Sequence, residues 1–257
     1  MANQPHVTSR TRRERSWQLI RSNYHARGWE SPYTIYQKMA TDLLRQGATV
    51  LDVGCGRTFP SAAWLLATGS RVYGIDPVVD PAAVIQGVSV DQGTSYDIPH
   101  PDGSIDLIVS QCVLEHLDRP IAAFAEFHRV LKVHGQVLFL TANKWDYVSL
   151  FAMLVPNRLH KRLVRATEGR EESDTFNVYY KANTAKAIAD LAAKSGFDID
   201  LLRYLNQFPY AVMFSPLLCR ALILYDKMIG RFGATHCLRG WLLGLMTKRE
   251  GPGPERH

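Results

Sequence analysis

The chain has 257 residues, of which 46% are hydrophobic and 21% are charged, with 18 Gly and 13 Pro. These values lie in the globular range and exclude disordered, collagen-like and disulfide-rich proteins, and the length suits one large domain with extensions. The formal net charge is +6, but the basic residues crowd the two ends and acids outnumber bases over 51–140, which argues against a central surface for nucleic-acid phosphates.

The predicted elements begin with a basic N-terminal arm over 1–30, which is polar and rich in arginine and which we interpret as mobile. A helix is expected over 36–46, where apolar residues recur at helical spacing, and Gly47 ends it. A strand over 49–53, apolar enough to be buried on both faces, runs into a glycine-rich turn. A helix over 61–68 then leads to a second strand over 71–75.

The alternation of strands and helices continues along the chain. Strands are expected over 88–90, 105–109, 136–141 and 197–204, and helices over 120–132 and 184–195. A less regular apolar stretch follows position 145. Because parallel strands need crossover connections that cover both faces, the pattern predicts an α/β fold with a doubly wound, mostly parallel sheet.

The C-terminal third is apolar, with a helix start at Ser215-Pro216 and a second apolar stretch over 241–246. We divide the chain into the basic arm, 1–30, a central domain, 31–205, and an apolar helical C-terminal lobe, 206–257. Three interpretations of the lobe stay open: core and lid, a dimer face, or a membrane-surface helix. Basic residues flank its apolar stretches, so contact with an anionic membrane surface is a serious alternative.

Glycines and acids stand at the ends of the first two predicted strands. Asp52 is followed by Gly54 and Gly56, and Asp76 ends the next strand. In an open parallel sheet the ligand lies beyond the carboxyl ends of the strands, where glycines allow the backbone to approach it. Since Asp76 is placed to accept hydrogen bonds from a ribose diol, a nucleoside is the expected ligand.

The loop departs from the dinucleotide fingerprint, because Phe59 stands where Gly-x-Gly-x-x-Gly requires its third glycine, and this disfavours NAD. Here the sequence resembles the class I S-adenosylmethionine-dependent methyltransferases, of the ubiquinone and menaquinone type. Segments 50–56, 98–106, 113–117 and 129–136 carry the likeness, with His134 where glycine is usual. The resemblance implies a Rossmann-like, seven-stranded sheet with an α-helical C-terminal extension and S-adenosylmethionine as cofactor.

The resemblance also implies roles for individual residues. The residues that would line the methionine end of the methyl donor are Asp52, Gly54, Cys55 and Gly56. Asp76 would bind the ribose hydroxyls, Tyr96 and Asp97 lie in the loop that holds the adenine, and Gln111 lies beside the methionine moiety. The Cys55 side chain is better explained as a small residue that fills space in the loop than as a nucleophile, since no His or base pattern typical of a catalytic cysteine stands near it in the sequence.

His116 is the candidate general base, because imidazole titrates near neutral pH and the residue follows the fourth strand. The alternative is that it only organises its loop. Quinone O-methyltransferases of this class bind a divalent metal through Glu-x-x-Glu-His, and here Cys112 replaces the first carboxylate. A thiol is a poor ligand for a hard cation, so no required metal is predicted.

The expected reaction is methyl transfer to a small or lipid-linked acceptor at oxygen. A non-catalytic module that binds the donor or its product stays open as an alternative, as does RNA ribose methylation. Amino methylation of nucleic-acid bases is disfavoured, because Ser110-Gln111-Cys112-Val113 stands where those enzymes carry Asn/Asp-Pro-Pro-aromatic. The four cysteines form no Cys-x-x-Cys pair, and 1–20 lacks an apolar run. A cytoplasmic protein is therefore expected, with the inner membrane face as an alternative location and no transmembrane span.

Overall fold

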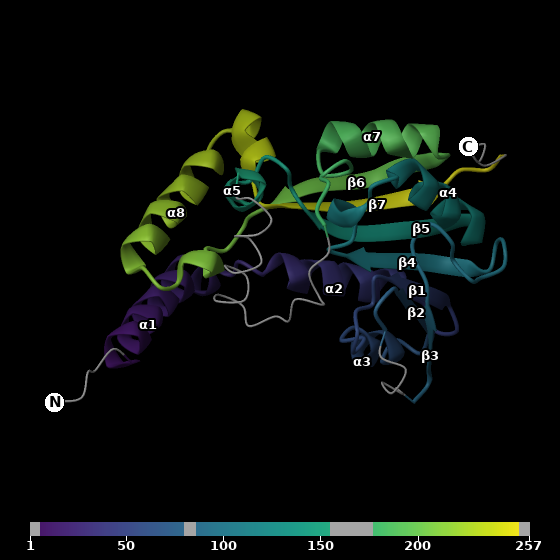
Figure 1. Ribbon diagram of the computed structural model, residues 1–257, viewed down its shortest axis with the longest axis horizontal. Helices are drawn as coiled ribbons and strands as arrows, with labels where there is room; N and C mark the ends of the chain where they lie inside the picture. The colour runs from purple at the N-terminus through teal and green to yellow at the C-terminus, as the bar shows by residue number, and fades with distance from the viewer. Residues whose placement is uncertain (1–5, 80–85, 155–176, 252–257) are drawn as a thin grey trace.

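The computed structural model describes residues 6–79, 86–154 and 177–251. Its centre is a seven-stranded sheet in the order β3-β2-β1-β4-β5-β7-β6 (Figure 1). The strands are β1 Thr49–Val53, β2 Arg71–Asp76, β3 Val88–Gln92, β4 Ile105–Gln111, β5 Leu131–Ala142, β6 Phe197–Leu205 and β7 Trp241–Lys248. Neighbouring strands are parallel except that β7 runs antiparallel to β5 and β6. The doubly wound, mostly parallel sheet is confirmed.

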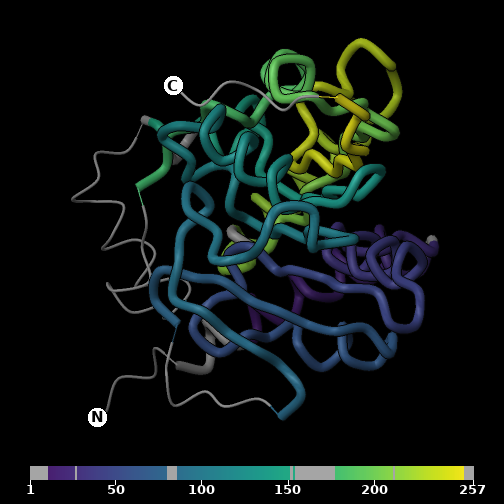
Figure 2. Tube along the Cα trace, turned by 90° about the vertical axis from the view of Figure 1, so that its right-hand side faces the viewer, coloured from purple at the N-terminus to yellow at the C-terminus, as the bar shows by residue number. Residues whose placement is uncertain are grey.

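Helices cover both faces of the sheet. On one face, α4 (Pro120–Val130) and α7 (Ala185–Lys194) bury Phe124, Phe127 and Ile188. On the other face, α2 (Pro32–Leu43) and α3 (Ala62–Leu66) bury Tyr36 and Leu65. In Figure 2, the purple and blue N-terminal half lies at one edge of the molecule and the green and yellow C-terminal half at the other, as the strand order requires.

Further helical elements lie around the sheet: α1 His6–Asn23, η1 His25–Arg27, η2 Leu114–His116, α5 Tyr147–Leu154, η4 Tyr210–Val212, α8 Pro216–Ile229 and η5 Gly233–Leu238. Of the less regular stretch after position 145, residues 155–176 lie outside the described residues. None of the helices in the described ranges combines the length and the apolar character that a membrane crossing requires.

The topological switch point of the sheet lies at β1, and this positions the site. β2 and β3 lie on one side of β1, and β4 and the later strands lie on the other. β1 pairs with β2 on one side and β4 on the other, so Val53 lies opposite both Ile75 and Ser110. Because the three strands are parallel, their carboxyl ends meet at one edge of the sheet. The loops that follow them converge at that edge.

The division at residue 205 is wrong, because the chain returns to the sheet after the helical part of the lobe. The stretch predicted as part of a helical lobe over 206–257 contains β7, which pairs with β5 and β6 along its whole length. Gly244 allows this close packing, since a Cβ there would lie 2.1 Å from the ring of Phe139. The helical extension is confined to η4, α8 and η5.

The interpretation of 1–30 as a mobile arm is also wrong for the described residues, which form α1 and η1. Ser16, Ile20 and Tyr24 recur every fourth residue and are buried, with Ile20 and Tyr24 packed beside Cys219 and Ile223 of α8. A narrow buried stripe is enough to hold an otherwise polar helix against the protein when a partner helix, here α8, covers the stripe.

Candidate functional site

The loop after β1 is held against the end of β2 by backbone hydrogen bonds. The N–H groups of Gly54 and Cys55 donate to the carbonyl oxygen of Ile75, at 2.8 and 3.1 Å. Gly54 and Gly56 have φ values of +78° and +73°, a left-handed conformation that favours glycine. A Cβ at Gly56 would meet only Pro60, at 3.9 Å, so the backbone there is open to a ligand.

Asp76 joins this loop to the end of β2. One carboxylate oxygen accepts a hydrogen bond from the Gly56 N–H and the other from the Val78 N–H, both at 2.9 Å. A carboxylate oxygen can accept more than one hydrogen bond, so the group retains capacity for a diol of a bound nucleoside. The position predicted for ribose binding is therefore part of the loop's own scaffold.

The Cys55 side chain is directed into the protein. The thiol packs against β2, since a Cβ at Gly74 would lie 2.9 Å from Cys55 Sγ and 2.5 Å from the ring of Phe59. Burial raises the pKa of Cys55 to about 12, with the charges of Asp52 and Asp76 acting in the same direction. Only the backbone of Cys55 is placed to line a ligand, and Phe59 fills the space that Gly74 leaves.

Asp52 lies beneath the loop and is 5% exposed. Its carboxylate accepts a hydrogen bond from the Ser61 hydroxyl, which comes directly before α3. Burial raises the pKa of Asp52 to about 7, and the Ser61 hydrogen bond opposes that shift while the charge of Asp76 adds to it. Sequence reasoning missed Ser61, because a serine before a helix predicts only a helix cap.

The segment after β4 lies beside the glycine loop. A Cβ at Gly54 would lie 2.2 Å from Val113 Cγ2, so the Val113 side chain can pack on the loop backbone only because position 54 is glycine. Cys112 has a φ of +58°, and its N–H donates to the carbonyl of Leu140 at 2.8 Å. This turn directs the chain from β4 into η2, which carries His116.

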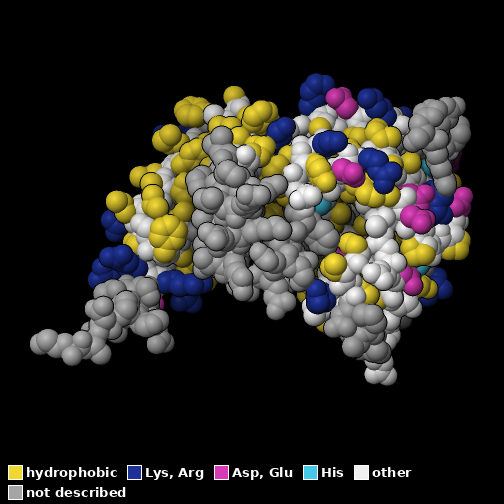
Figure 3. All heavy atoms as spheres, viewed as in Figure 1, with side chains coloured by type: hydrophobic (Ala, Val, Ile, Leu, Met, Phe, Trp, Pro, Cys, Tyr) yellow, Lys and Arg dark blue, Asp and Glu magenta, His cyan; other side chains and the backbone are white. Residues whose placement is uncertain are grey.

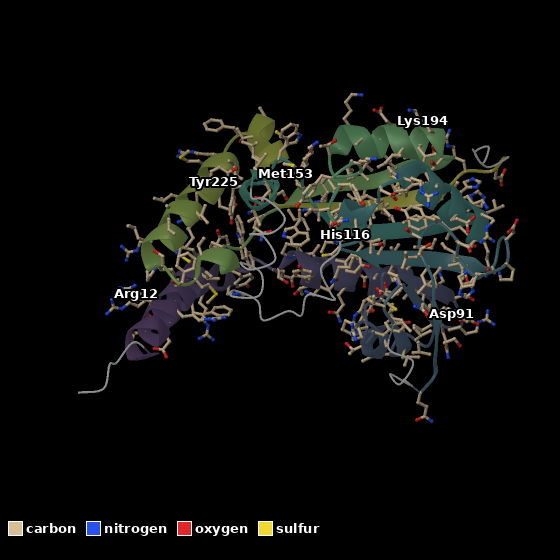
Figure 4. All side chains as sticks on the ribbon, viewed as in Figure 1. Arg12, Asp91, His116, Met153, Lys194 and Tyr225 are labelled. Carbon is tan, nitrogen blue, oxygen red and sulfur yellow. The ribbon has the colours of Figure 1, made fainter. Side chains whose placement is uncertain are left out.

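His116 is half-buried, and its ring is oriented by a backbone carbonyl. Nδ1 lies 2.9 Å from the carbonyl oxygen of Asn177. A carbonyl only accepts, so Nδ1 carries the proton and the neutral ring has its lone pair on Nε2. Figure 4 shows His116 at this edge of the sheet, toward the side where α5, with Met153, and α8, with Tyr225, lie.

A buried polar network lies next to His116. Thr141 Oγ1 donates to Glu115 Oε2 at 2.7 Å, and Asn183 Nδ2 donates to Thr141 Oγ1 at 2.7 Å. The Glu115 carbonyl also accepts the N–H groups of Tyr179 and Tyr180. Burial raises the pKa of Glu115, while the Thr141 hydrogen bond and His116 oppose that shift. Sequence reasoning did not identify Thr141 or Asn183, which are distant along the chain and carry no motif.

The residues predicted near the adenine lie farther along the same edge. The Tyr96 hydroxyl donates to Asp118 Oδ1 at 2.6 Å and accepts the Asp118 N–H, so it bridges to the segment after η2. Arg119 covers one face of the Tyr96 ring, 4.6 Å from its centroid. Asp97 is exposed next to a turn. Gln111, which was predicted beside the methionine moiety, is exposed at the end of β4.

Metal-ligating side chains are dispersed in the part of the chain that the structure describes. Across 6–79, 86–154 and 177–251, three or more His, Cys, Asp or Glu side chains nowhere come together in an arrangement suited to a metal ion. The prediction that no metal is required stays a prediction.

Comparisons with known proteins agree with this arrangement. A family described as a methyltransferase domain matches residues 51–139. The chain is 30% identical over 193 residues to a Mycolicibacterium smegmatis protein named "Probable S-adenosylmethionine-dependent methyltransferase", covering 70% of this chain and 71% of that protein. It is 36% identical over 142 residues to a ubiquinone biosynthesis O-methyltransferase of Pseudomonas syringae pv. tomato. That match covers 48% of this chain and only 60% of the relative.

Solved structures share the architecture at low sequence identity. Geranyl diphosphate C-methyltransferase from Streptomyces coelicolor A3(2), crystallised with Mg²⁺, geranyl-S-thiolodiphosphate and S-adenosyl-L-homocysteine, aligns with a TM-score of 0.54. The alignment covers 84% of this chain and 76% of that chain, at 18% identity. At this identity the likeness shows the fold.

Proposed function

The chain belongs to the S-adenosylmethionine-dependent methyltransferases, and we propose that it methylates an oxygen atom of a small or lipid-linked acceptor. Its cofactor is S-adenosylmethionine, which supplies a methyl group already activated by a sulfonium centre. The protein must hold the acceptor atom in line with that methyl group and remove the hydroxyl proton.

The glycine loop and Asp76 fit the donor. Gly54 and Gly56 turn the backbone at the carboxyl end of β1, and the open space at Gly56 leaves room for a ligand. Asp76 retains acceptor capacity beyond its bonds to Gly56 and Val78. We assign Asp76 to the ribose hydroxyls and the loop backbone to the methionine end.

The single observation that carries the oxygen assignment is the orientation of His116. The Asn177 carbonyl keeps the proton on Nδ1, so Nε2 is the basic atom. Val113, in the same segment, packs on Gly54, which brings η2 next to the donor loop. An imidazole whose Nε2 is the basic atom, placed next to the donor loop, suits removal of a proton from a phenol or alcohol. The name of the Pseudomonas relative also supports oxygen as the methylated atom.

Methyl transfer from labelled S-adenosylmethionine tests the proposal. Phenols, catechols and quinols with short and long apolar tails are offered to the purified protein, and the products are analysed for O-, N- or C-methylation. His116→Gln is expected to lower turnover at neutral pH by about a hundredfold or more, with donor binding unchanged. His134→Gln is the matched control, because His134 is exposed and pairs with Glu250.

Two results would contradict the proposal. One is a product methylated at nitrogen or carbon, or label found in an RNA fraction rather than in a small acceptor. The other is O-methylation that proceeds in His116→Gln at the parent rate, which would reduce His116 to a residue that organises its loop.

A further inference from the structure

Helices α1 and α8 pack on each other to one side of the sheet (Figure 1). They share a small core of their own, in which Ile20 and Tyr24 meet Cys219 and Ile223. The Tyr24 hydroxyl donates to Asp226 Oδ2 at 2.8 Å in the buried interface. The pair lies on the side toward which the parallel strands end, the side of His116 (Figure 4).

The solvent-facing side of α8 is apolar. Leu217, Leu224 and Met228 follow one another at spacings of seven and four residues, and they are 77%, 61% and 65% exposed. Phe214 before the helix and Phe232 after it are 61% and 63% exposed and extend the same apolar surface. Helical spacing places the three α8 side chains on one stripe, opposite the buried side of the helix. Figure 3 shows hydrophobic side chains gathered over this part of the molecule.

Basic side chains border the stripe. Arg220 and Lys227 occupy the helical positions along one edge of it, and Arg231 follows the helix. Exposed arginines of the neighbouring α1 add Arg12, Arg13, Arg15 and Arg21. The acids of the two helices are Glu14 and the buried Asp226. Lys and Arg side chains lie beside the apolar region in Figure 3.

We propose that the α1–α8 surface docks on an anionic lipid bilayer. An apolar stripe edged by Lys and Arg is the form that lets a helix lie in the interfacial plane, with its apolar side among the acyl chains and its cations at the headgroups. Nucleic acid would satisfy the cations but leave Leu217, Leu224 and Met228 in water. A second copy of the chain would bring two cationic surfaces together.

Docking here would supply the proposed reaction with a lipid-linked acceptor from the membrane, on the side of the sheet where the strands end. In that respect the inference rests on the proposed function. The docking itself does not depend on it, and it is measured by vesicle binding rather than by turnover. A failure of O-methylation therefore leaves the docking result unaffected.

The experiment is co-sedimentation of the full chain with vesicles of phosphatidylcholine alone or mixed equally with phosphatidylglycerol. Leu224→Glu/Met228→Glu is expected to lower partition to the mixed vesicles by more than about tenfold, because two exposed apolar side chains that would enter the acyl region are replaced by charged ones. The matched control is Ile121→Glu/Val133→Glu, which adds the same charges at positions 41% and 55% exposed on α4 and β5. Thermal unfolding establishes that each variant is folded.

A second variant and its control separate the contribution of the basic residues from that of the apolar stripe. Arg220→Ser/Arg231→Ser is expected to lower partition about fivefold for each cation removed, since a basic residue near an anionic surface contributes about 1 kcal/mol. Lys186→Ser/Lys194→Ser on α7 is its control and is expected to bind as the parent does.

Three results would overturn the proposal. Parent protein that stays in the supernatant with mixed vesicles shows no docking. Binding that Leu224→Glu/Met228→Glu leaves unchanged shows that the apolar stripe does not enter the bilayer. A parent dimer in sedimentation velocity that this variant dissociates, without vesicle binding, assigns the surface to a second copy.

Discussion

The carboxylate of Asp76 accepts the backbone N–H of Gly56 at 2.9 Å, which links the end of β2 to the loop after β1. The second oxygen of the same carboxylate accepts the Val78 N–H, so both strand-end loops are held by one side chain. A loop fixed in this way loses little conformational entropy when a ligand binds to it. Asp76 is therefore expected to contribute to donor affinity in two ways, by direct hydrogen bonds and by holding the loop.

Asp76→Asn is expected to weaken S-adenosylmethionine binding about tenfold to a hundredfold, the range for hydrogen bonds to a charged group. The amide has a single acceptor oxygen, so one of the two backbone N–H groups also loses its partner. Calorimetry measures the affinity, with the exposed Asp91→Asn on β3 as control. A variant with reduced unfolding free energy but parent affinity would refute the role in ribose binding.

Gly54→Ala is expected to destabilise the protein for two separable reasons. The φ of +78° costs an L-residue about 1–2 kcal/mol, and the new Cβ would also lie 2.2 Å from Val113 Cγ2. Gly103→Ala measures the backbone cost alone, since its φ is +62° and nothing lies within 4 Å of a Cβ there. Denaturant unfolding gives the free energies.

The double variant Gly54→Ala/Val113→Ala removes the offending methyl group. It is expected to be more stable than Gly54→Ala, because the steric overlap disappears while the backbone strain remains. A double variant less stable than Gly54→Ala would show that the Val113 side chain does not crowd a Cβ at position 54.

The central sheet was predictable because its first strands are short apolar runs next to a glycine or an acid that marks a turn. The predicted strand over 49–53 coincides with β1, and those over 71–75 and 105–109 differ from β2 and β4 only at their ends. These segments are local: periodicity and the turn residues that follow are enough to identify them. The resemblance to methyltransferases then indicated the cofactor.

The wrong assignments involve contacts between distant parts of the chain. An apolar run such as 241–246 fits a buried helix or a strand equally well, and only its pairing with β5 and β6 decides. Gly244 within the run was the available signal, because glycine in a strand marks a close approach, here of Phe139. In α1, the buried Ile20 has its partners in α8, about two hundred residues later.

The polar network around His116 could not be predicted for the same reason. Thr141 meets Glu115 only through the pairing of β4 with β5, and Asn183 meets Thr141 only through the path of the chain before α7. Sequence reasoning identified the segment over 113–117 by its likeness to a family motif. The motif includes Glu115, but it does not show which distant residues form hydrogen bonds with the Glu115 carboxyl group.

Thr141→Val is expected to lower the unfolding free energy by about 1–3 kcal/mol, because the buried Glu115 carboxyl group and the Asn183 amide both lose a partner. Thr247→Val is the matched control: its hydroxyl donates to Asp200 Oδ2 in an exposed setting, where water replaces the bond. The control should cost only a few tenths of a kcal/mol. If the two variants lose the same unfolding free energy, the buried hydrogen bond from Thr141 to Glu115 contributes no more to stability than the exposed one from Thr247 to Asp200.

Asp52 is expected to make stability depend on pH. Its pKa is raised from 3.8 to about 7, chiefly by burial, so the folded protein holds a proton that the unfolded chain releases. In the interval between these two values the folded state binds more protons, and the contribution of Asp52 to the unfolding free energy falls as pH rises. Below pH 3.8 this contribution is fully present, and above about pH 7 it is lost.

Asp52→Asn removes the titrating group and keeps an acceptor for Ser61. The difference in unfolding free energy between parent and variant should therefore change steadily from pH 3.8 to about 7 and level off above it, with the parent losing ground. Urea unfolding at a series of pH values measures it, and Asp97→Asn, at an exposed site, should run parallel to the parent. If the parent instead gains stability relative to Asp52→Asn across this interval, then Asp52 is ionised in the folded protein and the Ser61 hydrogen bond outweighs its burial.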